Sequence, residues 1–309
     1  MAINEKQRQE RQGYIGASDV PAILGEDPFK SAYDIWAEKT GKVQHKEKVN
    51  RAVHIGRYLE EAILKMSEEE LGQLDTDPQR LEFAVPSLPI LVAHPDAVTL
   101  NSGNPVEAKS TNITRHAPNS DDWGKEGTDE VPDRVILQCT VQCMALKKEV
   151  CHNPVIIGGR GFVMFNIGYD EGLADMILNE VQDFWEKNVQ RDIPPDSMPS
   201  MDIARRIYRQ DLAIKVDDTV VSYWRQAVEL RKKVEERQEE YEKAIFAALG
   251  TAEAGECKDG MVTFYMQGRD SIDAERLRQD HPDIAAKYTK HTEYRVLRFK
   301  KGKAGKKKK

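Results

Sequence analysis

The hydrophobic and polar positions of this chain follow two periods, one typical of strands and one typical of helices. Residues 90–93 form an apolar run, 101–105 is a cluster of turn-forming residues, and 106–110 alternates apolar and polar side chains. We expect 90–93 and 106–110 to pair as a hairpin. The segments 155–159 and 161–168 predict a second hairpin further along the chain.

Helices are predicted where apolar residues recur three or four positions apart. Ser31 and Asp34 form the pattern of a capping box at the start of one of them, and Gly41 marks its end. The segment 216–249 is strongly charged, and we expect a long helix or a helical hairpin there that packs on a partner surface. The predicted helices are a short one capped by Ser18 or Asp19 and ended by Gly25, then 31–40, 50–72, one that opens at Pro132, 171–190, 216–249 and 273–280, the last flanked by strands over 260–267 and 294–300.

Candidate chemistry concentrates around the first hairpin. Side chains alternate along a strand, so Glu107 and Lys109 share one face of it. If Asp96 lies at the end of the neighbouring strand, its carboxylate falls within roughly 5 Å of Glu107, where like charges repel unless a cation lies between them. Hard oxygen ligands, among them the backbone carbonyl of Ala108, suit Mg²⁺ or Mn²⁺. Such a metal would activate water and polarise a phosphoryl oxygen while Lys109 orients the nucleophile, which predicts phosphodiester hydrolysis.

A solvated hairpin in a chain that is 32% charged is the alternative explanation. The same Glu-x-Lys pattern occurs again at Glu256 and Lys258, so the tripeptide alone has little specificity. The pattern around Glu107 differs from it by the Pro-Asp pair upstream, the preceding apolar run and the turn between them. From the residues alone, both interpretations stay open.

Two further places have both a functional and a structural interpretation. Gly56 would let its helix approach the sheet and bring Glu60 towards the metal, whereas the spacing fits a solvated glutamate equally well. Arg11 and Ser18 lie near a glycine-flanked helix N-terminus whose free amides would hold a phosphate. An ordinary capped helix explains the same residues, and the residues alone favour it.

Composition places this chain of 309 residues among globular proteins, with 39% hydrophobic and 7% aromatic residues. The formal net charge is −6, and six lysines within 301–309 leave −12 for the rest of the chain. Such an acidic body argues against nonspecific coating of nucleic acid and for contact with DNA through a local groove or channel. Residues 1–12 are polar and no segment is long and apolar enough to span a bilayer, so we expect an intracellular protein.

The cysteines are too unevenly spaced in this long chain to suggest a disulfide framework. Cys139 and Cys143 are one helical turn apart and Cys151 precedes His152, which leaves a soft-metal site open. Buried free thiols on a helix explain the same residues.

Taken together, the motifs resemble those of the lambda-exonuclease-like viral recombinases, the YqaJ group of the PD-(D/E)xK nuclease superfamily. The resemblance covers roughly residues 12–199. The motifs that carry it occur in the family order: Gly16-Ala17-Ser18-Asp19-Val20, Gly56-x-x-x-Glu60, His94-Pro95-Asp96, Glu107-Ala108-Lys109, Pro132 with Gln138, and Ile156-Ile157-Gly158-Gly159. The resemblance implies an α/β fold whose restriction-endonuclease-like core is a central mixed sheet flanked by helices, followed by a C-terminal helical and small α+β extension.

The resemblance also implies roles for the acidic residues and the lysine. Asp96, Glu107 and Glu60 would bind the metal, Mg²⁺ or Mn²⁺, as two ions. Lys109 would assist the attacking water.

For DNA binding, the resemblance implies that Arg11 and Ser18 hold the 5′ phosphate. Gln138 matches the first glutamine of the family's Gln-x-Gln pattern. The second glutamine falls on Thr140, with Gln142 one turn further on, so these two residues are further candidates for contact with water or DNA.

The activity that the resemblance implies is that of a Mg²⁺-dependent 5′→3′ exonuclease on linear double-stranded DNA. It would leave a 3′ single strand for a single-strand annealing protein, work as a ring-shaped homotrimer around DNA, and act in the cytoplasm of a bacterial host as a phage or prophage protein, without a membrane partner. An endonuclease of the same superfamily, for repair or restriction, is one alternative. A catalytically silent module that binds DNA ends or a recombinase is the other.

The predicted organisation has four parts. We expect a nuclease domain over 1–200, a linker over 201–216, a C-terminal helical and small α+β module over 217–300, and a lysine-rich tail over 301–309.

Overall fold

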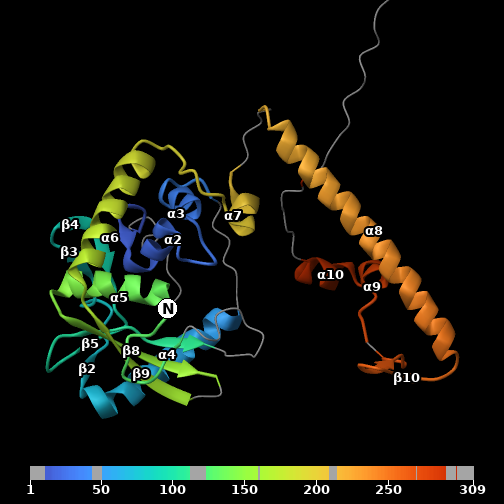
Figure 1. Cartoon of the computed structure of the whole chain (residues 1–309), viewed down its shortest axis with the longest axis horizontal. Coiled ribbons are helices and arrows are strands. Elements are labelled where there is room, and N and C mark those ends of the chain that lie inside the picture. The colour runs from blue at the N-terminus through green and yellow to red at the C-terminus, as the bar shows by residue number, and fades with distance from the viewer. Residues whose placement is uncertain are drawn as a thin grey trace, which may run out of the picture. The chain divides into compact units, whose positions relative to one another are not determined.

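The computed structural model describes residues 11–43, 51–111, 123–158, 161–208, 214–268, 270–289 and 297, with only the backbone for 51–54. The chain forms two compact units (Figure 1). The first runs through Tyr208, and the second spans Arg209 to Glu293. The boundary therefore falls inside the segment that was predicted to be a linker.

The first unit contains both sheets that surround the candidate chemistry. Its elements, in chain order, are β1 (Ile15–Gly16), the short helix η1 (Ala17–Asp19), α2 (Val20–Leu24), α3 (Ala32–Lys39), α4 (Arg51–Leu71), β2 (Leu74–Asp75), β3 (Phe83–Val85), β4 (Leu88–Ala93), β5 (Ala97–Thr99), β6 (Pro105–Val106), β7 (Lys109–Thr111), α5 (Asp133–Leu146), β8 (Val150–Ile157), β9 (Gly161–Gly168), α6 (Glu171–Phe184), the π-helical turn η2 (Trp185–Val189) and α7 (Met201–Arg206).

The larger sheet has the strand order β2-β5-β6-β8-β7, and β9 pairs with the remaining part of β8. It is mixed, because β6 and β7 run parallel to β8 whereas β9 runs antiparallel. An apolar cluster joins α5 to β8 and β9, and a smaller one joins Leu64 of α4 to Ala97 and Val106. The mixed sheet flanked by helices that the sequence predicted is confirmed.

The prediction that 90–93 pairs with 106–110 as a hairpin is wrong. β4, which contains the apolar run 90–93, pairs with β1 and β3 in the smaller sheet. The hairpin instead joins β5 to β6, with Ala97 opposite Val106. Pro95 explains the difference, because a residue without an N–H ends β4 before the hairpin begins.

The predicted strand 106–110 is divided into β6 and β7. Val106 pairs with His152 and Lys109 with Val155, so the same register places Pro154 of β8 opposite Ala108. In a parallel ladder the amide of residue 154 would bond the carbonyl of Glu107, and proline has no such donor. The second hairpin is confirmed for β9, but β8 begins before Pro154 and Gly159 lies outside the described residues.

The helix predicted over 50–72 is present as α4, but not all of its apolar residues are buried. Ile63 is buried, whereas Ile55 is 49% exposed and Met66 is 42% exposed. The buried stripe includes Ser67, which satisfies its hydroxyl locally by donating to the Ile63 carbonyl at 2.7 Å. Gly56 is not needed for a close approach, because a side chain added there would meet nothing within 4 Å.

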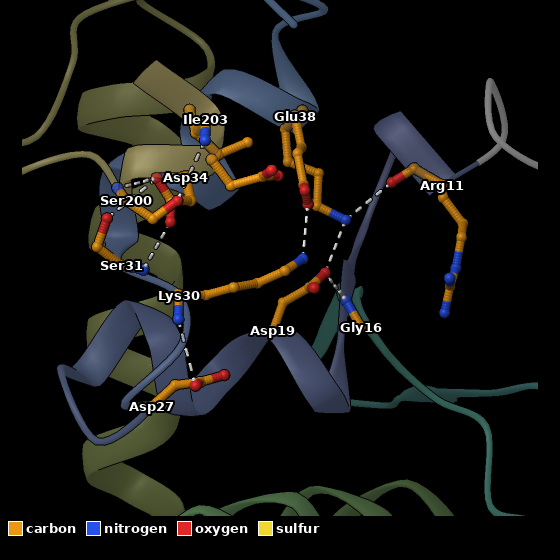
Figure 2. A network of polar contacts seen from close by, with 12 residues as sticks. Arg11, Gly16, Asp19, Asp27, Lys30, Ser31, Asp34, Glu38, Ser200 and Ile203 are labelled. Atoms are coloured by element: carbon orange, nitrogen blue, oxygen red, sulfur yellow. Dashed lines mark hydrogen bonds and ion pairs between the residues drawn. The ribbon is translucent and has the colours of Figure 1, made fainter. Parts of the chain in front are cut away.

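The predicted capping box of α3 is confirmed, and its aspartate also bonds a residue far away in the sequence. Ser31 accepts from the Asp34 amide, and the Asp34 carboxylate accepts from the Ser31 amide at 3.2 Å. The second Asp34 oxygen accepts from the Ser200 amide at 2.8 Å, and Ser200 in turn caps α7 (Figure 2). This buried carboxylate therefore ties α7, which lies in the predicted linker, to the first unit.

The second unit consists of α8 (Asp218–Leu249), β10 (Ala254–Cys257), β11 (Gly260–Thr263), α9 (Ala274–Asp280) and α10 (Pro282–Tyr288). The segment predicted as a long helix or hairpin is the single helix α8. The sequence did not predict β10 or α10, and the predicted strand 294–300 lies almost wholly outside the described residues. None of the described helices has the length and apolar character that a membrane span requires.

A buried ion pair holds the N-terminal segment. The Asp19 carboxylate accepts from the Gly16 amide at 3.1 Å and pairs with Lys39 at 2.8 Å, while Lys39 also donates to the Arg11 carbonyl (Figure 2). Asp19 thus bonds residues before it and does not cap α2, whose predicted end at Gly25 is confirmed. Burial raises the pKa of Asp19, but the charge and hydrogen bond of Lys39 outweigh burial, so the pKa lies below its ordinary value of 3.8.

Replacing Asp19 by asparagine should lower the free energy of unfolding by roughly 3 kcal/mol at pH 7, because Lys39 would keep a buried charge without its counterion. A lowered carboxyl pKa stabilises the fold above the ordinary value, and that stabilisation is lost as the pH falls through the lower folded-state value. The difference between wild type and D19N should therefore shrink below about pH 4.

Urea unfolding at pH 7 and at pH 3 to 4 checks this prediction. The matched control is D183N, which removes an exposed pair with Lys187 and should change stability by less than about 0.5 kcal/mol. A D19N protein as stable as D183N at pH 7 would contradict the importance of the buried pair.

Candidate active site

Asp96, Glu107 and Lys109 meet where the larger sheet is interrupted. Asp96 directly precedes β5, and its amide donates to the Val106 carbonyl at 3.0 Å. Its carboxylate accepts from the Ala108 amide at 2.8 Å. The Asp96 side chain therefore continues the β5–β6 ladder past the last paired residues, which holds its carboxylate beside Glu107.

The carboxylate of Glu107 is only 3% exposed and is bonded at both oxygens. Oε1 accepts from Lys109 Nζ at 2.5 Å and from Gln138 Nε2 at 2.7 Å. Oε2 accepts from Gln142 Nε2 at 2.5 Å. Lys109 Nζ also donates to Gln138 Oε1 at 3.1 Å, so the strand residues and α5 form one network.

The backbone of Glu107 is held by β8. Its amide donates to the His152 carbonyl at 2.9 Å. Its carbonyl accepts from Asn153 Nδ2 at 2.5 Å, in the place of the N–H that Pro154 lacks. Both ends of Glu107, backbone and carboxylate, are therefore fixed by neighbouring strands and by α5.

Burial and like charge dominate the electrostatics of the site. Burial raises the pKa of Asp96 well above its ordinary value, the charge of Glu107 raises it further, and Lys109 opposes both. Burial lowers the pKa of Lys109, but its pairing with Glu107 outweighs burial, so the pKa is raised and the amine stays charged. The negative charge of this carboxylate pair is thus only partly balanced by the lysine.

Glu60 of α4 lies on the other side of a cleft from Asp96. The cleft has a volume of about 670 Å³, and its lining includes Glu60, Arg57, Lys65, His94 and Asp96. Burial raises the pKa of Glu60, and the charge of Glu107 raises it further. The three predicted carboxylates therefore act on one another electrostatically, with Glu60 facing solvent in the cleft.

The donor chemistry of this site fits a hard divalent cation. Asp96 and Glu107 supply carboxylate oxygens whose mutual repulsion a cation would relieve. Among the described residues, no three His, Cys, Asp or Glu side chains converge as a ready-made metal site requires. The arrangement thus offers a pair of acidic ligands, to which Glu60 would have to move closer.

The soft-metal interpretation of the cysteines gains no support, because among the described residues no three His, Cys, Asp or Glu side chains converge around the cysteines either. Cys139, Cys143 and Cys151 are free thiols buried in the apolar cluster between α5 and β8. They pack as the alternative interpretation predicted.

Comparison with known proteins places these contacts in a family context. Residues 7–146 match the model of the YqaJ-like viral recombinase domain, and this range includes every acidic residue of the site, Lys109 and both glutamines. This part of the chain, less than half of its length, is therefore similar to the YqaJ-like viral recombinase domain.

The individual proteins to which the chain is similar are distant from it in sequence. The uncharacterised protein YqaJ of Bacillus subtilis strain 168 is 26% identical over 302 residues, which cover 94% of this chain and 92% of that protein. The crystal structure of LHK-Exo, an alkaline exonuclease of Laribacter hongkongensis, is 17% identical, covers 62% of this chain and 94% of its own, and has a TM-score of 0.46. A phage-related exonuclease of Haemophilus somnus 129PT is 12% identical, covers 58% and 96%, and has a TM-score of 0.39.

Of the three residues that the resemblance suggested on this helix, two reach the site and one does not. Gln138 and Gln142 lie one turn apart on α5 and both donate to Glu107. Thr140 is buried and donates to the Ile136 carbonyl at 2.8 Å, so it faces away from this network. Gln142 therefore takes the position beside Glu107 that the family pattern suggested for Thr140.

The residues predicted to hold the 5′ phosphate are not joined by any contact that the structure describes. Arg11 and Ser18 are both exposed, and the Arg11 side chain points away from Asp19 and Lys30 (Figure 2). Burial raises the pKa of Tyr14, and the hydrogen bond and charge of Arg11 oppose that rise. The Arg11 guanidinium thus lies beside the Tyr14 hydroxyl on the surface.

Sequence reasoning missed Asn153 and Cys151, which support the site from β8. Asn153 holds the Glu107 carbonyl, and Cys151 donates to Gln142. The alternation of the strand was a usable signal, because it places Cys151, Asn153 and Val155 on the same buried face. A polar residue at such an inward position needs a specific partner.

Proposed function

We propose that this protein is a metal-dependent deoxyribonuclease that digests linear double-stranded DNA from the 5′ end. The observation that carries the proposal is the pair of half-buried Asp96 and buried Glu107, which adjoins a charged lysine at the edge of an acidic cleft. The match to the YqaJ-like viral recombinase domain supports DNA as the substrate class.

Asp96, Glu107, the backbone carbonyl of Ala108 and Glu60, once it moves closer, would together hold two Mg²⁺ or Mn²⁺ ions. When bound, the metal supplies a water of lowered pKa and polarises a phosphoryl oxygen. Lys109 stays protonated beside Glu107. Its ammonium group orients the attacking water and balances charge that develops on the phosphate.

The Gln138 side chain supports this role of Lys109. It donates to Glu107 Oε1 and accepts from Lys109 Nζ, which keeps the acid and the amine in one fixed geometry. In the proposed reaction, the lysine therefore meets the substrate already oriented.

Polarity would come from the terminal phosphate. Arg11 offers an exposed, permanently charged guanidinium that suits bidentate binding of phosphate, and Ser18 offers an exposed hydroxyl. Recognition of a 5′ phosphate would make the enzyme degrade the strand that carries it and leave a 3′ single strand for an annealing protein.

Digestion of linear duplex DNA with a 5′ phosphate on one strand tests the activity. With Mg²⁺, only the phosphorylated strand should disappear, and EDTA should prevent the loss. E107Q should lower the rate by more than about a hundredfold. Removing a metal ligand should reduce activity more than removing a residue that only supports a ligand, which costs about 10- to 100-fold. E256Q is the matched control, because Glu256 has the same Glu-x-Lys context in an exposed strand, and it should retain full activity.

A closed circular duplex in the same assay separates the alternatives. Cutting of the circle would replace the exonuclease with an endonuclease. DNA that stays intact with Mg²⁺ and with Mn²⁺ would favour a catalytically silent module that binds DNA ends.

Arg11 has its own expected effect. R11A should raise KM for ends that carry a 5′ phosphate and leave KM for 5′ hydroxyl ends within about twofold, because one charge-assisted contact is removed. R231A, which removes a 79% exposed arginine of α8, is the control. Equal effects of R11A on both kinds of end would show that Arg11 does not read the phosphate.

We also propose that the protein assembles as a homotrimeric ring around DNA. An acidic chain needs a local channel to meet DNA, and a ring supplies one. We suggest that the second unit contacts a neighbouring subunit or a single-strand annealing protein, since α8 has no buried residue within the described part of its unit.

Sedimentation of the full chain should give about three times the mass of one 35.1 kDa chain. A chain without residues 217–309 should sediment as a smaller assembly if α8 joins subunits. A full-length monomer at micromolar concentration would contradict the ring, and an unchanged trimer after the deletion would exclude the second unit from assembly.

A further inference from the structure

The amide of Gln142 links the catalytic glutamate to a thiol. Gln142 Nε2 donates to Glu107 Oε2, and Gln142 Oε1 accepts from Cys151 Sγ at 3.3 Å. Gln142 and Cys151 are both fully buried. A buried amide is costly unless both of its ends are bonded, so these two contacts decide how the side chain lies.

The two partners of Gln142 fix the direction of its amide. A carboxylate only accepts hydrogen bonds, so the NH₂ end of the amide faces Glu107, and the amide oxygen is left to accept from the thiol. Burial raises the pKa of Cys151 well above its ordinary value, so the group remains a donor. If the amide turned over, its oxygen would face the Glu107 carboxylate, and its NH₂ group would face the thiol proton.

The position of Glu107 Oε2 depends on the Gln142 amide more than the positions of the other Glu107 atoms do. Oε1 is held by Lys109 and Gln138, and the backbone is held by His152 and Asn153. In the described structure, Gln142 is the side chain that bonds Oε2. A change in Gln142 would therefore rotate the carboxylate while its backbone stays in place.

We propose that Cys151 is a positioning residue for catalysis: its thiol fixes the Gln142 amide, and Gln142 thereby fixes the orientation of the Glu107 carboxylate. The inference rests on the proposed nuclease function, in which Glu107 holds the metal. Cys151 itself does not touch the substrate.

A purely structural role is the competing explanation, because Cys151 also packs in the apolar cluster between α5 and β8. Cys143 provides the matched control. It is a buried thiol in the same cluster, and its described contacts do not include Gln142 or Glu107. Removing either thiol leaves a similar small cavity, so C143A and C151A should lose similar stability.

The test compares C151A, C151S and C143A in the full-length chain. C151A should lower kcat about fivefold, as expected for one net hydrogen bond, with KM for DNA within about twofold. C151S keeps a donor and should recover most of kcat. C143A should leave kcat unchanged despite its loss of stability.

A double-mutant cycle tests whether the thiol acts through the glutamine. If it does, adding C151A to Q142L should lower kcat no further than Q142L alone. Independent losses that multiply in the double variant would overturn the proposal, and so would a C151A kcat equal to that of C143A.

Crystal structures of the same variants separate this inference from the nuclease proposal. The contact between Gln142 Nε2 and Glu107 Oε2 should be lost or displaced in C151A and kept in C151S and C143A. An inert wild type would refute the nuclease, while an unchanged contact in C151A would refute the positioning role whatever the activity.

Discussion

Burial of the Glu107 carboxylate is the constraint on which the rest of the first unit depends. A buried negative charge is strongly unfavourable unless hydrogen bonds and a counter-charge compensate it. Lys109, Gln138 and Gln142 provide that compensation from a strand and from α5. The helix, the interrupted strand and β8 must therefore be placed together for the residue to be tolerated at all.

The positive charge of Lys109 does not balance all the negative charge at the site. This imbalance is what makes the site chemically useful. One lysine faces two nearby carboxylates, and a third lies across the cleft on α4. Hydrogen bonds satisfy the oxygens of Glu107, but they do not cancel the repulsion that raises the pKa of Asp96. Residual repulsion at a solvent-lined edge is the condition under which a divalent cation or a protonated carboxyl becomes favourable.

Local signals in the sequence predicted much of the site, because strand and helix periods are local properties. Alternation placed Glu107 and Lys109 on one face, and the capping box of α3 is present as Ser31 and Asp34 predicted. The sequence left both Thr140 and Gln142 as candidates, and the contact to Glu107 shows that Gln142 is the one that reaches the site. Roles in binding metal or DNA stay predictions, since geometry alone does not reveal them.

Most of the remaining differences in the first unit involve partners that are distant in sequence. The apolar run 90–93 was recognised as a strand, but no periodicity states that β4 pairs with β1 and β3. The bond from Ser200 to Asp34 likewise joins distant segments and places α7 within the first unit. In α4, the helical spacing of apolar residues did not show that Ile63 is buried whereas Ile55 and Met66 are exposed.

Pro154 and Asn153 have a consequence for how this sequence can change. Because Pro154 has no N–H, the carbonyl of Glu107 lacks its ladder hydrogen bond. The side chain of the neighbouring Asn153 donates to that carbonyl instead. Either substitution alone would leave the carbonyl of Glu107 unpaired or give it two competing donors. The two positions should therefore covary: homologous chains should either keep both Asn153 and Pro154 or replace both.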